Sequence, residues 1–137
     1  MKYVLDSSLA FKWIVPEALS DKAILLRGEF RQGLHEFLAP DVFPVEVGHA
    51  LTRAERQGRV STADGFALWT DAMLDCPQPF ASTDLMPTAY LLSSALRLGV
   101  YDCLYIALSQ RESCPVVTAD QRLVTRFPTN TVSLDCL

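Results

Sequence analysis

Four acidic residues stand where their side chains could form one cluster. Asp6 and Asp120 each follow directly on a short apolar run of the kind that forms a buried strand. Asp102 opens an apolar helical segment, and Glu46 lies about one turn inside another predicted helix. In an open parallel sheet, ligands bind outside the carboxyl ends of the strands. We therefore expect the four carboxylates to meet at one edge of the sheet.

A cluster of this composition suits hard divalent cations. Four carboxylates at close range do not all stay ionised unless cations lie between them. Oxygen ligands select Mg²⁺ or Mn²⁺ rather than zinc, and the chain has no C-x-x-C pair and only two separated histidines, His35 and His49. Ions held in this way lower the pKa of a bound water and stabilise a leaving oxygen during phosphoryl transfer.

The overall charge is compatible with such a site on an otherwise neutral domain. Twelve Lys and Arg stand against sixteen Asp and Glu, which gives a net charge of −4. The four candidate acids equal this excess. The composition therefore argues against a protein that binds nucleic acid or a membrane mainly through bulk positive charge. It is compatible with an enzyme that contacts nucleic acid only briefly.

Each acid also has a purely structural interpretation. Asp102 and Asp120 could cap the helices that follow them, and Glu46 could pair with Arg53 on a solvated helix face. His49, three residues after Glu46, is interpreted as a surface histidine, although it could tune that carboxylate or act as a general acid. Convergence of the four acids in the folded chain would favour the functional interpretation.

Alternating strands and helices predict an α/β fold with a parallel sheet and right-handed crossovers. Strands are predicted at 3–5, 36–39, 79–82, 115–119 and 131–134. Helical spacing of apolar residues predicts helices around 43–54, from a cap at Ser61 or Thr62 to 73, around 89–96 with Gly99 as its stop, over 103–108 and over 121–127. The chain has no internal repeat and no Gly/Ser linker, so we expect one domain over residues 1–137.

Four blocks of sequence carry a family resemblance over nearly the whole chain. They are Val4-Leu5-Asp6-Ser7-Ser8-Leu9-Ala10-Phe11-Lys12-Trp13 with Pro16-Glu17; Ala39-Pro40-Asp41 with Val45-Glu46-Val47 and Ala50-Leu51; Tyr101-Asp102-Cys103-Leu104-Tyr105-Ile106-Ala107-Leu108; and Val117-Thr118-Ala119-Asp120-Gln121-Arg122-Leu123. In this order they resemble PIN-domain ribonucleases, and most of all the toxin subunit of VapBC-type toxin–antitoxin pairs.

The resemblance implies a PIN-like fold in which helices cover both faces of a five-stranded parallel sheet. It implies an endoribonuclease that cleaves RNA with Mg²⁺ or with Mn²⁺ in its place. By this resemblance the catalytic and metal-binding residues are Asp6, Glu46, Asp102 and Asp120, of which Asp6 and Asp102 are the expected direct ligands. Ser8 and Thr118 are expected to support the acids. The implied partners are an RNA substrate, a cognate antitoxin and a second copy of the chain.

Positive and aromatic residues near the acids are candidates for contact with RNA. The arginines are Arg53, Arg56, Arg59, Arg122 and Arg126. Trp69 and Tyr105 are expected in the core, and the role of Trp13 is left open. The apolar segment 11–15, with Leu25-Leu26 beyond it, could form an antitoxin groove or a dimer face, or could lie inside the monomer.

Three other classes of function are weighed against the nuclease. A phosphatase with an aspartyl nucleophile requires a second Asp two residues after the first, where this chain has Ser8. A nucleotide-binding switch is excluded because the chain has no Gly-rich phosphate loop. The stronger alternative is a catalytically silent PIN-fold module that recognises RNA or a protein partner.

The sequence predicts a cytoplasmic protein. An acid at position 6 leaves no apolar stretch for a signal peptide, and the apolar region 90–108 is interrupted by Arg97 and Asp102, so no membrane span is expected. The four scattered cysteines are expected to be reduced.

Overall fold

A five-stranded parallel sheet forms the central layer of the molecule. The computed structural model describes all residues, 1–137, and places the strands in the order β3-β2-β1-β4-β5. The strands are β1 (Lys2–Leu5), β2 (Glu36–Pro40), β3 (Gln78–Phe80), β4 (Val116–Thr118) and β5 (Thr131–Ser133). The five predicted strands are confirmed. The third ends at Phe80 rather than at 82, because Ser82 already begins the next helix.

The strand order reverses in the middle of the sheet. From β1 the chain moves outward through β2 and β3, and it later returns to place β4 and β5 on the other side of β1. The backbone amide of Asp6 donates to the carbonyl of Val117 at 3.2 Å, which extends the pairing of β1 and β4 to the first residue after β1. Open α/β sheets bind ligands in the crevice at such a reversal.

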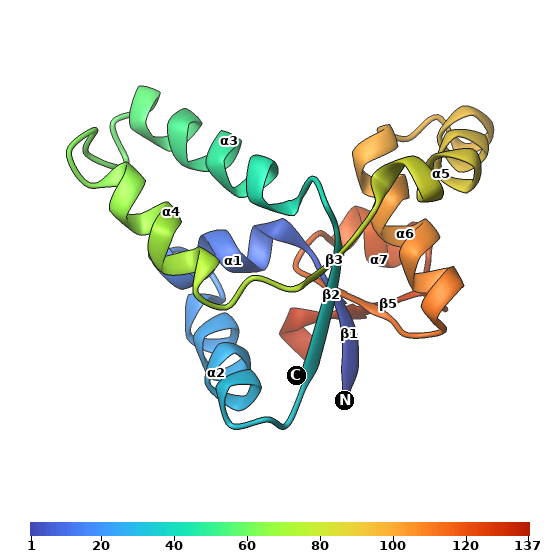
Figure 1. Ribbon diagram of the computed structural model, residues 1–137, viewed down its shortest axis with the longest axis horizontal. Coiled ribbons are helices and arrows are strands. Elements are labelled where there is room, and N and C mark those ends of the chain that lie inside the picture. The colour runs from blue at the N-terminus through green and yellow to red at the C-terminus, as the bar shows by residue number, and fades with distance from the viewer.

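Helices cover both faces of the sheet, as the resemblance implies (Figure 1). Helices α1 to α4 lie on one side, and α5 and α6 on the other, while α7 packs beside β4 and β5. Their bounds are α1 (Ser7–Ile14), α2 (Ser20–Arg31), α3 (Phe43–Arg56), α4 (Gly65–Met73), α5 (Ser82–Leu96), α6 (Val100–Glu112) and α7 (Gln121–Arg126), with a 3₁₀ turn at Leu134–Cys136. No helix is both long and apolar enough to span a bilayer.

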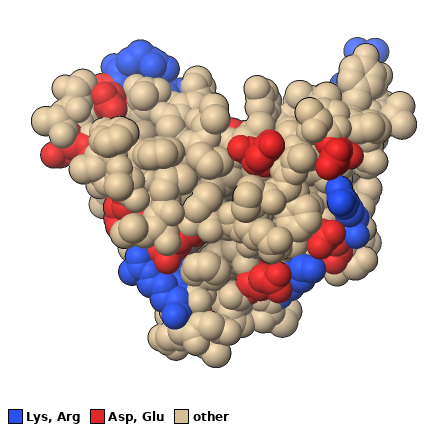
Figure 2. All heavy atoms as spheres, viewed as in Figure 1, with Lys and Arg blue, Asp and Glu red and all other residues tan.

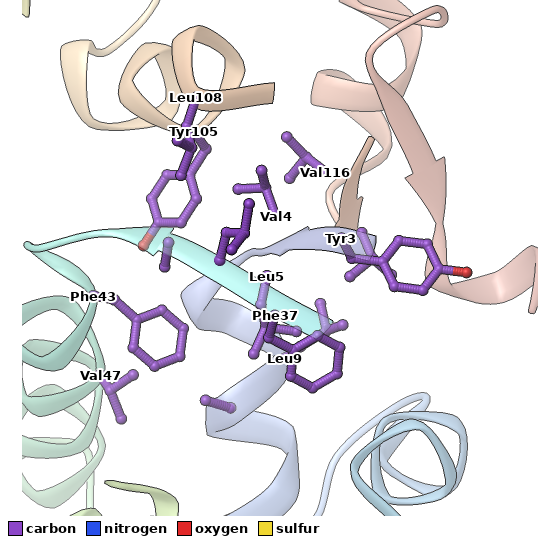
Figure 3. Close-up of a cluster of buried hydrophobic side chains, with 14 of the residues drawn as sticks. Tyr3, Val4, Leu5, Leu9, Phe37, Phe43, Val47, Tyr105, Leu108 and Val116 are labelled. Atoms are coloured by element: carbon purple, nitrogen blue, oxygen red, sulfur yellow. The ribbon is translucent and has the colours of Figure 1, made fainter. Parts of the chain in front are cut away.

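The core lies where the sheet meets α6 on one face and α1 and α3 on the other (Figure 3). Val4, Leu5 and Val116 are fully buried in the strands. In α6 every residue from Cys103 to Ser109 is buried, which confirms the prediction that this helix is enclosed nearly all round. An acid in its first turn is consequently held on a helix with little freedom to move.

Segment 11–15 lies inside the monomer. Each of its residues is less than 10% exposed, so it is neither an antitoxin groove nor a dimer face. The indole N–H of Trp13 donates to the carbonyl of Ala23 at 3.0 Å, and the guanidinium of Arg27 lies 4.9 Å from the centre of the indole ring. Trp13 is therefore a core residue and is not available to stack on a base.

Three local predictions are wrong. α4 begins at Gly65, because Ser61 accepts a hydrogen bond from the amide of Ala63 and closes a separate turn before the helix. Phe66, expected on the apolar stripe of that helix, is 76% exposed and stacks on the half-buried Trp69. The stop after α5 is Arg97, whose φ of 55° is left-handed, whereas Gly99 precedes α6 in an extended conformation.

Candidate active site

The elements bring all four predicted acids to the carboxyl end of the sheet. Asp6 lies between β1 and α1, and Asp120 lies between β4 and α7. Glu46 is in the first turn of α3, which follows β2, and Asp102 is in the first turn of α6. Figure 2 shows this side of the molecule hollowed between the α3–α4 arm and the α5 arm, with acidic residues at the base of the hollow.

Two hydroxyl groups fix the carboxylate of Asp6. Thr118 Oγ1 donates to Asp6 Oδ2 at 2.6 Å, and Ser8 Oγ donates to the same oxygen at 2.8 Å. Thr118 Oγ1 also accepts from the backbone amide of Asp120 at 3.0 Å, so one buried hydroxyl links the ends of β1 and β4. Because both hydroxyls bond to Oδ2, Oδ1 is left without a side-chain donor and can accept a cation.

Glu46 is held by a residue that the sequence placed only in the core. Tyr105 is 2% exposed, as predicted, yet its hydroxyl donates to Glu46 Oε1 at 2.7 Å. Tyr105 lies three residues after Asp102 on α6, so the two side chains share a face of that helix. This spacing is the signal that could have identified Tyr105 as a site residue. Glu46 makes no ion pair with Arg53, which removes the structural interpretation of this acid.

The pKa values indicate that the acids share one low-dielectric environment. Burial raises the pKa of Glu46 to about 6, against the bond from Tyr105, and the charges of Asp6 and Asp102 add to the rise. Burial also raises the pKa of Asp102, with Asp6 and Asp120 contributing. For Asp6, burial again raises the pKa and outweighs the two hydroxyl bonds. The pKa of each of these three acids is therefore raised in part by the charge of at least one other acid.

Asp120 has the structural role that the sequence allowed. It caps α7, since its Oδ1 accepts from the backbone amide of Arg122 at 2.9 Å. Its Oδ2 also forms an ion pair with the guanidinium of Arg122 at 3.3 Å. Asp102 differs, because its side chain makes no capping hydrogen bond and remains free at the start of α6.

The donor set fits Mg²⁺ or Mn²⁺, but not a closed metal cage. The available ligands are carboxylate oxygens, which hard cations prefer. As the side chains stand, no three acidic, histidine or cysteine residues converge on one point. Mg²⁺ commonly keeps several waters and uses only one or two carboxylates, together with phosphate oxygens of the substrate. The free Oδ1 of Asp6 and the carboxylate of Asp102 are consistent with such an open arrangement.

Other candidate residues lie away from the acids or make different contacts. Arg59 pairs with Glu17 at 3.0 Å, and Arg53 and Arg56 are exposed in the last turn of α3, at the opposite end of that helix from Glu46. The side chain of His49 is exposed and forms no hydrogen bond or ion pair. Arg97 at the end of α5, together with Arg122 and Arg126 of α7, lines one cleft with Asp102 and Asp120.

Comparison with known proteins agrees with this arrangement. The family model described as PIN domain matches residues 3–127. Ribonuclease VapC1 from Mycobacterium tuberculosis is 32% identical over 127 aligned residues, covering 87% of this chain and 90% of that protein.

Two solved structures share the fold. A crystal structure of PAE2754 from Pyrobaculum aerophilum matches with a TM-score of 0.72 at 20% identity, covering 99% of this chain and 94% of that one. A crystal structure of VapBC2 from Rickettsia felis bound to a DNA fragment from their promoter matches with a TM-score of 0.60 at 15% identity, covering 97% of each chain. Because the family model spans most of the sequence, and ribonuclease VapC1 is similar along nearly all of it, the chain belongs to the PIN domain family.

Proposed function

We propose that this protein is a metal-dependent endoribonuclease that cleaves RNA phosphodiester bonds with Asp6, Glu46, Asp102 and Asp120. The observation that supports the proposal is that all four carboxylates lie at the carboxyl end of the sheet, near its switch point, and that three of them have raised pKa values. A purely structural group of acids would be expected to have basic partners, whereas here only Asp120 has one. The similarity to ribonuclease VapC1 supports the same chemistry.

The four acids and the hydroxyl groups that hold them have different proposed roles. Asp6 and Asp102 are the proposed direct ligands of Mg²⁺, with Mn²⁺ as a substitute, and Asp120 completes the cluster. A bound ion would lower the pKa of a water and stabilise charge on the phosphate. Glu46, with a pKa of about 6, is suited to orient an attacking water and to accept a proton near neutral pH. Tyr105 and Thr118 keep the carboxylates oriented before substrate arrives.

We further propose that the nuclease is a toxin restrained by a cognate antitoxin, and that it is cytoplasmic and forms a homodimer. The structural likeness to the VapBC2 chain shows the shared fold, and the similarity to ribonuclease VapC1 supports the toxin assignment. Copurification of the chain with the product of an adjacent short reading frame tests the antitoxin. Light scattering of the separated toxin tests the homodimer.

Cleavage of a mixed RNA pool tests the activity. The wild type, Asp6→Asn and Asp102→Asn are each incubated with Mg²⁺, with Mn²⁺ and with EDTA, and Asp21→Asn on the exposed surface of α2 serves as the matched control. We expect metal-dependent cleavage by the wild type and by the control, and none by the two site variants. Equal cleavage by all four proteins would refute the assigned site. A folded wild type that binds RNA or antitoxin but cuts nothing would favour the silent binding module.

A further inference from the structure

Few oxygen atoms of the acidic cluster are free to bind a cation. Asp6 Oδ2 accepts from two hydroxyl groups, and Glu46 Oε1 accepts from a buried phenol. Both oxygens of Asp120 accept from Arg122. Asp102 is the one acid of the four whose side chain forms no hydrogen bond or ion pair. A cation that needs carboxylate oxygens therefore finds Asp102, Oδ1 of Asp6 and the second oxygen of Glu46.

Arg122 brings a permanent positive charge into the cluster. Its Nη2 lies 3.3 Å from Asp120 Oδ2, and its Nε lies 3.5 Å from Asp120 Oδ1. The same arginine also acts on Asp102, which belongs to a different helix. Burial, Asp6 and Asp120 raise the pKa of Asp102, and the charge of Arg122 opposes them. A guanidinium is not deprotonated in proteins, so Arg122 acts on two of the four acids at once, as a bound cation would.

No other basic side chain is placed in this way. The ion pair between Arg122 and Asp120 is the only one in the structure that includes an acid of the cluster. Arg126 belongs to the same helix, but it donates to the carbonyl of Leu96 at 2.9 Å instead of to an acid. The positive charge inside the cluster therefore comes from one residue.

This charge leaves room for one divalent cation but not for two. A positive charge near two carboxylates helps both of them to stay ionised, and Arg122 already has this role for Asp102 and Asp120. A second divalent ion at the same place would be repelled by the guanidinium and would have to displace it to reach Asp120. No point exists on which three of the acids converge, whereas a single Mg²⁺ commonly uses only one or two carboxylates.

We propose that the guanidinium of Arg122 takes the place of a second divalent cation, so that the protein without RNA binds a single Mg²⁺ or Mn²⁺ through Asp6 and Asp102. The proposal rests on the proposed function for the identity of the metal site, but its test counts bound ions and does not depend on cleavage. Arg122 is in this sense a positioning residue, because it acts on the site through Asp120 and limits the number of ions.

The number of bound ions tests the proposal. Mn²⁺ is titrated into the RNA-free protein, and the unbound ion is measured by electron paramagnetic resonance. Arg122→Gln is compared with the wild type and with Arg126→Gln, a control that removes the same charge from the same helix without touching an acid. We expect one ion in the wild type and in the control. In Arg122→Gln we expect a second ion, and the first should bind roughly 2–5-fold more tightly.

Three further variants identify the carboxylates that hold each ion. Asp102→Asn should lose the single ion, whereas Asp120→Asn should keep it. The double variant Arg122→Gln/Asp120→Asn should not bind the second ion, because Asp120 is the group that Arg122→Gln sets free. Arg122→Lys keeps the positive charge and should again bind one ion. The side chain of Arg122 is 88% exposed, so its replacement should not disturb the core, and thermal unfolding in EDTA checks that each variant is folded.

This proposal and the proposed nuclease fail in different ways. Two ions in the wild type would overturn the role of Arg122, even if the protein cleaves RNA. One ion in every folded variant would overturn it too. A second ion in both Arg122→Gln and Arg126→Gln would mean that the general charge of α7, rather than the bond to Asp120, limits the number of ions. A second ion in Arg122→Gln alone, without cleavage of RNA by the wild type in Mn²⁺, would instead refute the nuclease and leave the role of Arg122 standing.

Discussion

Replacing Glu46 with glutamine should stabilise the protein at neutral pH while it lowers cleavage. Burial and the neighbouring acids raise the pKa of Glu46 from 4.5 to about 6. In the folded state the charged form is therefore less favourable than in the unfolded chain. Glutamine is neutral, has nearly the same shape, and keeps an oxygen that accepts the hydrogen bond from Tyr105.

The size of the gain follows from the pKa difference. A rise of about 1.5 pH units corresponds to about 2 kcal/mol at a pH above both values, at about 1.4 kcal/mol per unit. Because Glu46 is only partly buried, solvent reduces this figure, and we expect Glu46→Gln to gain about 1–2 kcal/mol at pH 7.5. For a chain of this length the melting temperature should rise by roughly 3–8 °C.

The pH dependence gives the sign of the effect. Since the folded state binds the proton of Glu46 more tightly, the wild type loses stability as the pH rises from about 4.5 through about 6. The greater stability of Glu46→Gln over the wild type should therefore vanish below pH 4.5 and reach its full size above pH 7. Thermal and urea unfolding in EDTA at pH 4, 5, 6 and 7.5 measure this difference, with Glu36→Gln on the exposed start of β2 as the control.

Two results would refute the reasoning. A variant less stable than the wild type at pH 7.5 would mean that ionised Glu46 is not destabilised by its surroundings. A stability difference that does not change between pH 4 and pH 7.5 would mean that packing, rather than charge, separates the two proteins. In Mg²⁺, the wild type should gain more stability than the variant, because an ion held by Asp6 and Asp102 would be attracted by the neighbouring charge of Glu46, bind the wild type more tightly and stabilise its folded state by mass action.

Three further predictions concern the supports of the site and of the fold. Thr118→Val removes the hydroxyl that bonds to Asp6, so cleavage should fall ~10–100-fold and require more Mg²⁺, while Thr70→Val on the exposed face of α4 should cleave normally in the same metal titration. Asp75→Asn should cost about 3 kcal/mol in urea unfolding at pH 7, because two arginines donate to this buried carboxylate at 2.6 Å. Burial raises the pKa of Asp75, but the bonds from the two arginines lower it by more, so that the pKa lies below its usual value. The difference in unfolding free energy between the wild type and Asp75→Asn should therefore shrink as the pH falls below about 4. Trp13→Phe should cost about 1–3 kcal/mol by leaving a buried carbonyl without its donor, and RNA binding measured by anisotropy should not change.

The sequence alone determined the strands, the enclosed helix and the position of four acids at the carboxyl end of the sheet. Local patterns carry this information: a short β-branched run ending in an acid predicts both a strand and the position of its side chain at the carboxyl end. The segment 103–108 could be identified as buried because it has no polar face. The family resemblance rests on the same local blocks, and the family match confirms it.

Tertiary structure decided which side chains touch, because these contacts join residues far apart in the chain. Tyr105 reaches Glu46 across 59 positions, and Thr118 reaches Asp6 across 112. Likewise, the turn at Arg97 meets α7, which gives this arginine a place in the cleft and leaves Arg53 on the far end of α3. Periodicity fixes the face on which a residue lies within its own element. The packing of one element against another, which depends on the whole core, fixes what that face meets.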